Sequence, residues 1–184
     1  MDYTHSYLSP LGRITLASDG ESLTGLWFPG QKYFASTLGA EHEEKSLPIF
    51  TETDRWLRIY FGGKEPDFTP TLRMRGTAFR KAVWSALLGI PYGRTATYGD
   101  IARQLGLSPM YARAVGSAAG HNPLSIIIPC HRVVGADGSL TGYAGGLDRK
   151  IKLLALEHSH SANAEWYERK RNQDSAFFRC INFL

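Results

Sequence analysis

Residues 129–132 hold the side chains best suited to covalent chemistry. They place Cys130, one of two cysteines in the 184-residue chain, next to His131 and Arg132. A free thiol has a pKa near ~8.5 and attacks weakly until a base or a nearby positive charge favours the thiolate. His131 and Arg132 offer both. We therefore predict that Cys130 is a nucleophile and that His131 takes its proton, most simply through one water molecule.

The residues before Cys130 leave a structural alternative open. A lone cysteine is often a small buried core residue, and Cys130 follows the apolar run Ile126-Ile127-Ile128. Pro129 would end a strand there, because proline donates no ladder hydrogen bond. The run is therefore predicted as a strand, with the thiol at a strand-to-turn junction. The second cysteine, Cys180, has no neighbouring base, and no chemistry is assigned to it.

Ordered motifs accompany this stretch along most of the chain. They are Ser9-Pro10-Leu11-Gly12, Leu23-Thr24-Gly25-Leu26, Phe79-Arg80-Lys81-Ala82-Val83-Trp84, Ile90-Pro91-Tyr92-Gly93, Arg113-Ala114-Val115-Gly116, Asn122-Pro123, Ile128-Pro129-Cys130-His131-Arg132-Val133 and Gly142-Tyr143-Ala144-Gly145-Gly146-Leu147. Their order and spacing resemble the O6-alkylguanine-DNA alkyltransferase family over about residues 6 to 157.

The resemblance implies a DNA repair protein. Such a protein transfers the alkyl group of O6-alkylguanine irreversibly to its own cysteine, here Cys130, and so reacts once per molecule. Its partner is double-stranded DNA, from which the damaged base is flipped out of the stack. O4-alkylthymine stays open as a second substrate. We expect a monomer in the cytoplasm, at the nucleoid in a bacterium, with cooperative DNA binding left open.

The resemblance also implies roles for residues around the thiol. A glutamate at the position of Glu157 orients His131, which makes a Cys-His-Glu relay with the logic of a catalytic triad. Asn122 pins the turn that carries the thiol, since a buried amide offers two donors and an acceptor. Tyr98 matches the tyrosine that contacts the phosphate of the target nucleotide and helps to protonate the guanine ring.

The pocket for the extruded base is implied in the same way. Tyr143 matches the residue beside that base, on a glycine-rich loop whose backbone can approach a ligand closely. Ala144 stands where some relatives have serine, which leaves the accepted size of the alkyl group open. The backbone groups of Cys130 and Val133 are expected to read the edge of the guanine.

Arg113 is the most distinctive residue for DNA. An inserted side chain can fill the gap left by a flipped base, and the family uses an arginine at this position, on a helix in the minor groove. Small residues at Ala112, Gly116 and Ala119 would let that helix approach the DNA backbone. Tyr111 departs from the family, which commonly has a small residue there. A plain phosphate contact is the alternative role for Arg113.

Charge is distributed unevenly along the chain. Residues 1–70 contain six Lys/Arg and ten Asp/Glu, whereas residues 71–152 contain eleven Lys/Arg and three Asp/Glu. A basic segment of this kind is expected where a protein faces a polyanion, although a solvated surface explains it equally well.

The two cysteines also exclude some classes of protein. Because they lie 50 positions apart, they make neither a disulfide framework nor a four-ligand zinc site, and they favour a reducing compartment. No metal and no cofactor is predicted. No stretch is typical of a secretory signal or of a membrane span.

Composition and periodicity predict an α/β (α+β) fold with two domains. Residues 1–70 are predicted as a small β-rich structural domain, and residues 71–157 as a helical domain that carries DNA binding and the active site. The polar segment 65–70, with its two prolines, is the expected linker. Residues 158–184 form a C-terminal tail to which no role is assigned.

Local patterns predict the elements of each domain. In the first domain, residues 13–17 and 23–28 make a hairpin around Asp19-Gly20, and residues 56–61 make a short helix that stops at Gly62-Gly63. In the second domain, helices are expected between Thr77 and Gly89, over residues 97–105 with a capping box of Thr97 and Asp100, from Ser108-Pro109 onward, and over residues 147–157.

Three of these helices carry a further interpretation. The second and third helices of the second domain flank Gly106 and are typical of a helix-turn-helix of winged-helix-like type. The last helix is expected to bury a stripe of Leu147, Ile151 and Leu154.

Three other functions are compatible with parts of the pattern. A non-catalytic alkyltransferase-like protein would recognise the damage and bind DNA, but those relatives lack the cysteine that Cys130 supplies. A helix-turn-helix regulator would need a further ligand-binding or dimerisation domain. A Cys-His hydrolase would need oxyanion donors, and no hydrolase motif surrounds Cys130.

Overall fold

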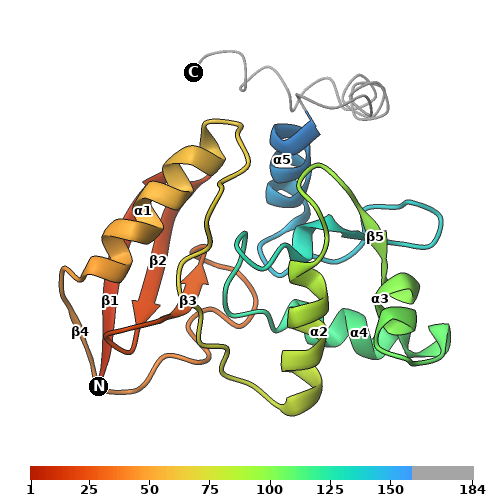
Figure 1. Ribbon diagram of the computed structural model, residues 1–184, viewed down its shortest axis with the longest axis horizontal. Coiled ribbons are helices and arrows are strands. Elements are labelled where there is room, and N and C mark those ends of the chain that lie inside the picture. Colours follow the sequence, from red (N-terminus) through yellow and green to blue (C-terminus); the bar gives the residue numbers. More distant parts are fainter. Residues whose placement is uncertain (159–184) are drawn as a thin grey trace.

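The computed structural model describes residues 1–158, and Figure 1 shows their arrangement. Four strands form the N-terminal sheet in the order β3-β2-β1-β4. They are β1 (Asp2–Ser9), β2 (Gly12–Ser18), β3 (Leu23–Trp27) and β4 (His42–Glu44). The pairs β1–β2 and β2–β3 are antiparallel, whereas β4 runs parallel to β1.

The predicted hairpin is confirmed as β2 and β3. Its turn is closed by Asp19, whose Oδ1 accepts hydrogen bonds from the backbone N–H groups of Glu21 (3.2 Å) and Ser22 (2.9 Å). Strand β1 was not expected, because its residues lack an apolar alternation. Its pairing with β2, from Tyr3 opposite Ser18 onward, supplies the hydrogen bonds that hold it extended.

Helix α1 (Pro48–Phe61) covers one face of this sheet (Figure 1). It buries Phe50, Trp56 and Leu57. The predicted end at Gly62 is confirmed, but the helix begins earlier than expected, at Pro48. A proline fits the first turn of a helix because its missing N–H has no intrahelical partner there.

The C-terminal helices are α2 (Ala78–Leu88), α3 (Tyr98–Gln104) and α4 (Ala112–Gly120). The predicted caps are confirmed: Thr77 accepts a hydrogen bond from the N–H of Arg80, and Thr97 forms a complete capping box with Asp100. Between α3 and α4, Gly106 has a φ of 72° and the 3-10 turn η1 (Pro109–Tyr111) follows. The helices α3 and α4 are the predicted helix-turn-helix.

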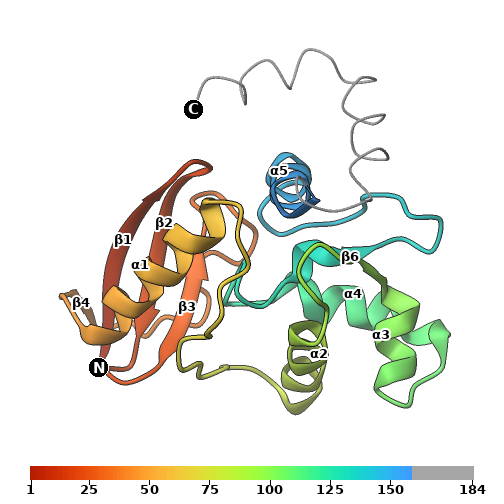
Figure 2. The same cartoon turned by 45° about the horizontal axis from the view of Figure 1, so that its top comes forward.

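Helix α5 (Leu147–His158) lies between the N-terminal sheet and the other C-terminal elements (Figure 2). The predicted stripe was partly wrong, because Leu147 is 46% exposed at the start of the helix and Ile151 is half-buried. The buried face consists instead of Lys150, Leu153, Leu154, Glu157 and His158. His158 therefore belongs to the helix and not to the tail, and residues 159–184 lie outside the described residues.

The prediction of a strand over residues 126–128 was wrong. Ile126 has a φ of 70°, and Ile128 donates a 2.9 Å hydrogen bond to the carbonyl of Leu124, so the run forms a buried turn. Leu124 makes an isolated bridge to Leu26 of β3. The chain must then turn sharply to begin the 3-10 helix η2 (Cys130–Arg132), and this tertiary need overrides the strand preference of isoleucine.

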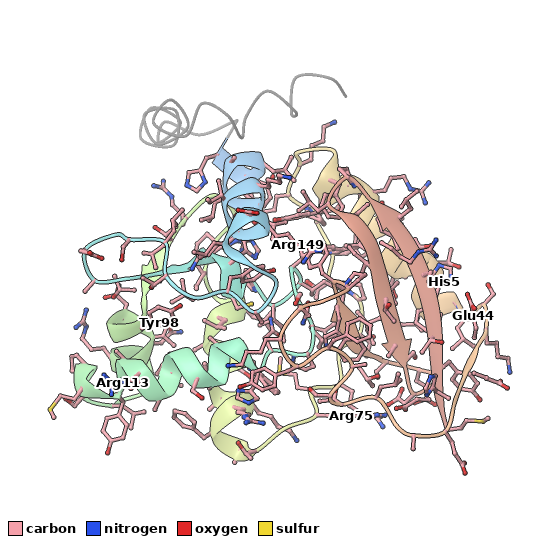
Figure 3. All side chains as sticks on the ribbon, turned by 180° about the vertical axis from the view of Figure 1, so that it is seen from behind. His5, Glu44, Arg75, Tyr98, Arg113 and Arg149 are labelled. Carbon is pink, nitrogen blue, oxygen red and sulfur yellow. The ribbon has the colours of Figure 1, made fainter. Side chains whose placement is uncertain are left out.

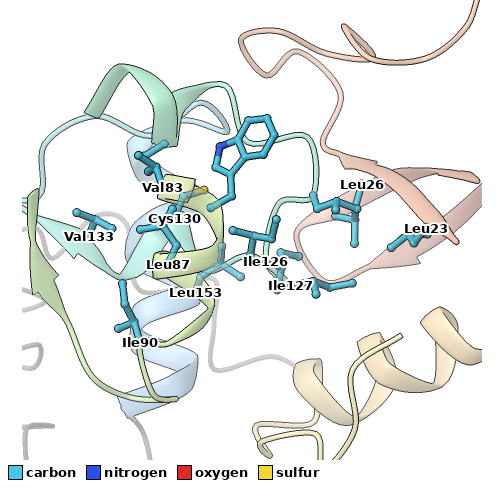
Figure 4. Close-up of a cluster of buried hydrophobic side chains, with 14 of the residues drawn as sticks. Leu23, Leu26, Val83, Leu87, Ile90, Ile126, Ile127, Cys130, Val133 and Leu153 are labelled. Atoms are coloured by element: carbon cyan, nitrogen blue, oxygen red, sulfur yellow. The ribbon is translucent and has the colours of Figure 1, made fainter. Parts of the chain in front are cut away.

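The apolar side chains of both halves form one continuous core. Figure 4 shows Leu26 of β3 near Ile126 and Ile127, with Val83 and Leu87 of α2 on the side of Cys130. Two short strands, β5 (Ala96–Thr97) and β6 (Val133–Val134), pair in parallel next to this core. Within residues 1–158, no helix has the length and apolar character needed to cross a bilayer.

Candidate active site

Cys130 opens η2, and its side chain is buried. The Nδ2 atom of Asn122 lies 3.2 Å from the sulfur and 2.8 Å from the carbonyl oxygen of Ile128. The Oδ1 atom of Asn122 accepts a 2.9 Å hydrogen bond from the N–H of Leu124. One buried amide thus holds both ends of the turn and contacts the thiol, which is the placement expected from the sequence.

His131 and Glu157 form a buried pair behind the thiol. The Nε2 atom of His131 lies 2.6 Å from Oε1 of Glu157, and both side chains are excluded from solvent. Nε2 therefore carries the shared proton, while Nδ1 has no hydrogen-bond partner among the described residues. No hydrogen bond joins the imidazole to the sulfur of Cys130 within residues 1–158. We call Cys130, His131 and Glu157 the relay.

The charges in this pair are set by burial and by the surrounding donors. Burial lowers the pKa of His131, and the carboxylate of Glu157 only partly restores it. Burial would raise the pKa of Glu157, but His131 and Arg132 hold it well below its usual range. The neutral imidazole beside a permanent carboxylate is the state required of a general base.

The expected role of Arg132 as the positive charge beside the thiol was wrong. Its Nε lies 2.9 Å from Oε2 of Glu157, its Nη2 lies 3.1 Å from Oε1, and its Nη1 lies 2.6 Å from the carbonyl of Ile90. Neighbours in a 3-10 helix project in different directions, so Arg132 serves the carboxylate and not the sulfur.

The positive charge near the thiol comes from Lys150, which the sequence reasoning missed. Its buried ammonium donates to the carbonyl groups of Val133 (2.5 Å), Thr141 (2.9 Å) and Gly142 (3.3 Å). Burial lowers the pKa of Lys150 to about 8. Burial raises the pKa of the Cys130 thiol, whereas Asn122 and Lys150 act to lower it.

Tyr98 and Tyr143 lie on the sides of this centre. The Tyr98 hydroxyl donates a 3.1 Å hydrogen bond to the carbonyl of Thr141, and its ring faces the backbone of Gly116 on α4. Burial and the charge of Cys130 raise the pKa of Tyr98. The Tyr143 ring meets the His131 ring edge-on at 6.5 Å. Tyr143 therefore borders His131, and Tyr98 lies close enough to Cys130 to feel its charge.

The backbone groups expected to read guanine are already engaged. The N–H of Val133 donates to the carbonyl of Cys130, and the carbonyl of Val133 accepts from Lys150. The N–H of Cys130 donates a 2.8 Å hydrogen bond to the carbonyl of Ile128. A carbonyl oxygen has a second lone pair, so a purine amine can share these groups but does not find them vacant.

The surface expected to face DNA is formed by α4 and η1. Arg113 is exposed, Ala112 and Gly116 are half-exposed, and Tyr111 is 52% exposed. Figure 3 shows Arg113 and Tyr98 at the same end of the molecule. The expectation that Ala119 approaches the DNA backbone was wrong, because its side chain is buried in the core, nearer the end of α4.

Among residues 1–158, no group of three or more His, Cys, Asp or Glu side chains is arranged to hold a metal ion. The described residues thus bring together Cys130, His131, Glu157 and Asn122, with Tyr98 and Tyr143 beside them.

Both halves of the chain match known families. Residues 78–159 match the family described as 6-O-methylguanine DNA methyltransferase, DNA binding domain, and residues 3–74 match its ribonuclease-like domain. A methylated-DNA–protein-cysteine methyltransferase of Mycolicibacterium paratuberculosis is 49% identical over 153 residues, which cover 83% of this chain and 90% of the relative. One of Haemophilus influenzae is 44% identical over 156 residues, covering 84% of this chain and 85% of the relative.

Solved structures show the same fold. The crystal structure of Mycobacterium tuberculosis OGT in complex with DNA superposes with a TM-score of 0.78 at 44% identity. The match covers 90% of this chain and 98% of that one. The arrangement of sheet and helices described above is therefore shared across most of both chains.

Proposed function

Since this chain belongs to the 6-O-methylguanine DNA methyltransferase family, we propose that it repairs DNA by transferring the alkyl group from O6 of guanine to the sulfur of Cys130. The observation that carries the proposal is the setting of the thiol. It is buried, lies 3.2 Å from the amide of Asn122, and precedes a histidine bonded to a buried carboxylate. The complex of the Mycobacterium tuberculosis relative with DNA supports DNA as the partner.

In the proposed reaction, the thiolate sulfur attacks the alkyl carbon in line with its bond to O6. A carbon–sulfur bond forms and the carbon–oxygen bond breaks, and the electron pair of that bond goes to guanine. Nδ1 of His131 takes the thiol proton through water, and Glu157 stabilises the imidazolium. The hydroxyl of Tyr98 gives a proton to the leaving guanine and recovers one from solvent. The reaction uses no cofactor.

The proposed substrate is double-stranded DNA that contains O6-alkylguanine. The base must leave the stack to reach a buried thiol, at a cost of a few kcal/mol. Arg113 is exposed at the start of α4 and is assigned to the gap. The half-exposed Ala112 and Gly116 are assigned to the approach of α4 to the DNA backbone, and the half-buried Tyr143 and Ala144 are assigned to the space for the extruded base.

The same proposal assigns different roles to the two domains. Residues 71–157 carry DNA binding and transfer, and residues 1–70 support them. The protein is proposed to act as a monomer in the cytoplasm. A thioether to a simple alkyl group is not hydrolysed by water, so each molecule is proposed to react once.

Mass spectrometry of the intact protein after incubation with DNA containing O6-methylguanine tests this function. We expect one added methyl group per molecule, located on Cys130 and not on Cys180. Cys130→Ala should abolish transfer but keep DNA binding, because phosphate contacts supply most of the affinity. DNA binding by the wild-type protein without any mass gain would favour the non-catalytic damage-recognition protein. Repeated turnover with unmodified Cys130 would contradict both.

A further inference from the structure

Tyr60 reaches the relay from outside the C-terminal half of the chain. It lies near the end of α1, and its side chain is fully buried. Its hydroxyl donates a 2.7 Å hydrogen bond to Oε1 of Glu157 and lies 3.3 Å from Nε2 of His131. Helix α1, which covers the N-terminal sheet, thus places the Tyr60 hydroxyl against both His131 and Glu157, the pair that activates the thiol.

The ring of Tyr60 is held on several sides. It stacks on Trp56 with ring centroids 5.3 Å apart and planes at 8°, and it meets Phe61 edge-on at 5.5 Å. The rings of Tyr92 and His131 approach it edge-on at 6.1 Å and 6.4 Å. Packing therefore fixes the ring, and the hydroxyl has little freedom to leave Glu157.

The apolar packing of α1 does not itself require this hydroxyl. A buried hydroxyl is destabilising unless it is hydrogen-bonded, and phenylalanine would fill nearly the same volume. Burial and the nearby Glu157 raise the pKa of Tyr60 well above its usual value, so the hydroxyl stays protonated and remains a donor. Its placement is explained by what it does for Glu157.

Three atoms form a closed set of hydrogen bonds that contains two protons, one on the Tyr60 hydroxyl and one on Nε2 of His131. Oε1 of Glu157 accepts both from Tyr60 and from Nε2 of His131, and the Tyr60 oxygen can itself accept from Nε2. This set holds the proton of the neutral imidazole on Nε2. It leaves Nδ1 as the basic nitrogen, which the proposed reaction requires.

We infer that Tyr60 is a positioning residue for alkyl transfer, which acts through Glu157 to hold His131 in its Nε2–H form and in its orientation. The inference rests on the proposed function. It also makes the N-terminal part a working component of the active site and not only a support.

Other groups share the same space and enter any pH dependence. Glu157 is faced by Tyr60 from α1, by the N–H of Gly93 at 3.2 Å, and by Arg132 from η2. The charge of Lys150 acts on both His131 and the Cys130 thiol, and Tyr143 borders His131. The test must therefore remove the Tyr60 hydroxyl alone.

Tyr60→Phe and Tyr92→Phe form a matched pair for this test. Each variant removes one phenolic hydroxyl from the same aromatic cluster, but the Tyr92 hydroxyl has no hydrogen-bond partner among residues 1–158. The single-turnover rate with free O6-benzylguanine should be measured from pH 5.5 to 9, together with the melting temperature. The free base avoids any effect on DNA binding.

We expect Tyr60→Phe to react about tenfold more slowly, the effect of one hydrogen bond to a charged group. With one donor fewer on Glu157, the carboxylate holds the His131 proton more strongly. The acid limb of the rate profile should therefore move to higher pH. Tyr92→Phe should keep the wild-type rate and limb.

A double-variant cycle separates this role from a structural one. If Tyr60 acts through Glu157, then Tyr60→Phe combined with Glu157→Gln should be no slower than Glu157→Gln alone. Additive losses would overturn the inference. So would a Tyr60→Phe protein that fails to fold, or one that is less stable but keeps the wild-type rate and pH limb. Lack of any transfer by the wild-type protein would instead defeat the proposed function.

Discussion

The backbone N–H of Lys32 donates a 2.9 Å hydrogen bond to the carbonyl oxygen of Ala144, which ties the N-terminal part to the loop of residues 141–146. Arg149 makes a second tie nearby. Its Nη1 donates a 2.8 Å hydrogen bond to the carbonyl of Gly145, and its guanidinium lies 4.8 Å from the ring centroid of Phe28. The loop that carries Tyr143 is therefore tied to the N-terminal part at two points.

Arg149→Ala should loosen this loop. The variant loses both the hydrogen bond to Gly145 and the contact with Phe28, so Tyr143 is held less firmly beside the site for the extruded base. We expect the single-turnover rate with O6-benzylguanine to fall several-fold while the free energy of unfolding falls by about 1 kcal/mol. Arg149→Lys keeps the positive charge but loses the planar guanidinium group. Its single-turnover rate and its free energy of unfolding should therefore lie between those of the wild-type protein and those of Arg149→Ala. A wild-type rate in Arg149→Ala would show that the contacts of Arg149 with Gly145 and Phe28 are not needed to position Tyr143.

Asn122→Ala should make the thiol a weaker nucleophile at neutral pH. The side chain donates to the sulfur of Cys130, and this hydrogen bond opposes the rise in pKa that burial causes. Without it, the pKa of Cys130 rises further and the thiolate fraction falls. A hydrogen bond to a charged group contributes about 1.5–3 kcal/mol, so we expect about a 10- to 100-fold slower transfer at pH 7.

The pH dependence distinguishes this effect from a misfolded turn. In Asn122→Ala, the rate should recover as the pH is raised, with a midpoint above that of the wild-type protein. A loss that is the same at every pH would assign Asn122 to the turn of residues 122–130 alone. Circular dichroism of the variant provides the control for folding.

The order of motifs predicted the relay, because Cys130, His131 and Glu157 each lie at a matching position in a recognisable pattern. Contacts that cross between distant elements could not be predicted in this way. Tyr60 is 97 positions from Glu157, and their hydrogen bond depends on how α1 packs against α5 and η2. A tyrosine in an amphipathic helix gives no local sign of such a partner.

The burial of Lys150 could have been predicted from the sequence, but only from a weak signal. Lysine is normally exposed, yet Lys150 lies three and four positions before Leu153 and Leu154 and so shares their buried face. For residues 126–128, in contrast, the local signal was strong but the predicted strand was wrong. Their strand preference is real, but the bridge from Leu124 to β3 and the start of η2 force a turn with a positive φ at Ile126.

The stability of the protein should fall as the pH drops below about 6.5. Burial lowers the pKa of His131 in the folded state. In acid the unfolded chain therefore binds a proton at this histidine that the native protein does not bind, and the free energy of unfolding decreases. Glu157 has a depressed pKa in the folded state and adds an effect of the same sign below about pH 4.3.

His131→Gln isolates the first of these effects. The variant has no titrating group at this position, so its free energy of unfolding should change less between pH 7 and pH 5 than that of the wild-type protein. Urea denaturation at several pH values measures both slopes. Equal slopes would mean that other groups dominate the acid dependence.

Arg113→Ala should separate base extrusion from chemistry. Arg113 is exposed on α4, at the same end of the molecule as Tyr98 (Figure 3), and it makes no contact with the relay. If it fills the gap in the stack, its loss should slow repair of O6-methylguanine in duplex DNA by tenfold or more, because extrusion costs a few kcal/mol. The reaction with free O6-benzylguanine, which needs no extrusion, should stay within about twofold of the wild-type rate. Arg103→Ala is the matched control, since Arg103 is an exposed arginine on α3 that pairs with Asp100, and it should change both rates little. If Arg113→Ala slows the reaction equally with both substrates, Arg113 stabilises the fold and does not fill the gap in the base stack.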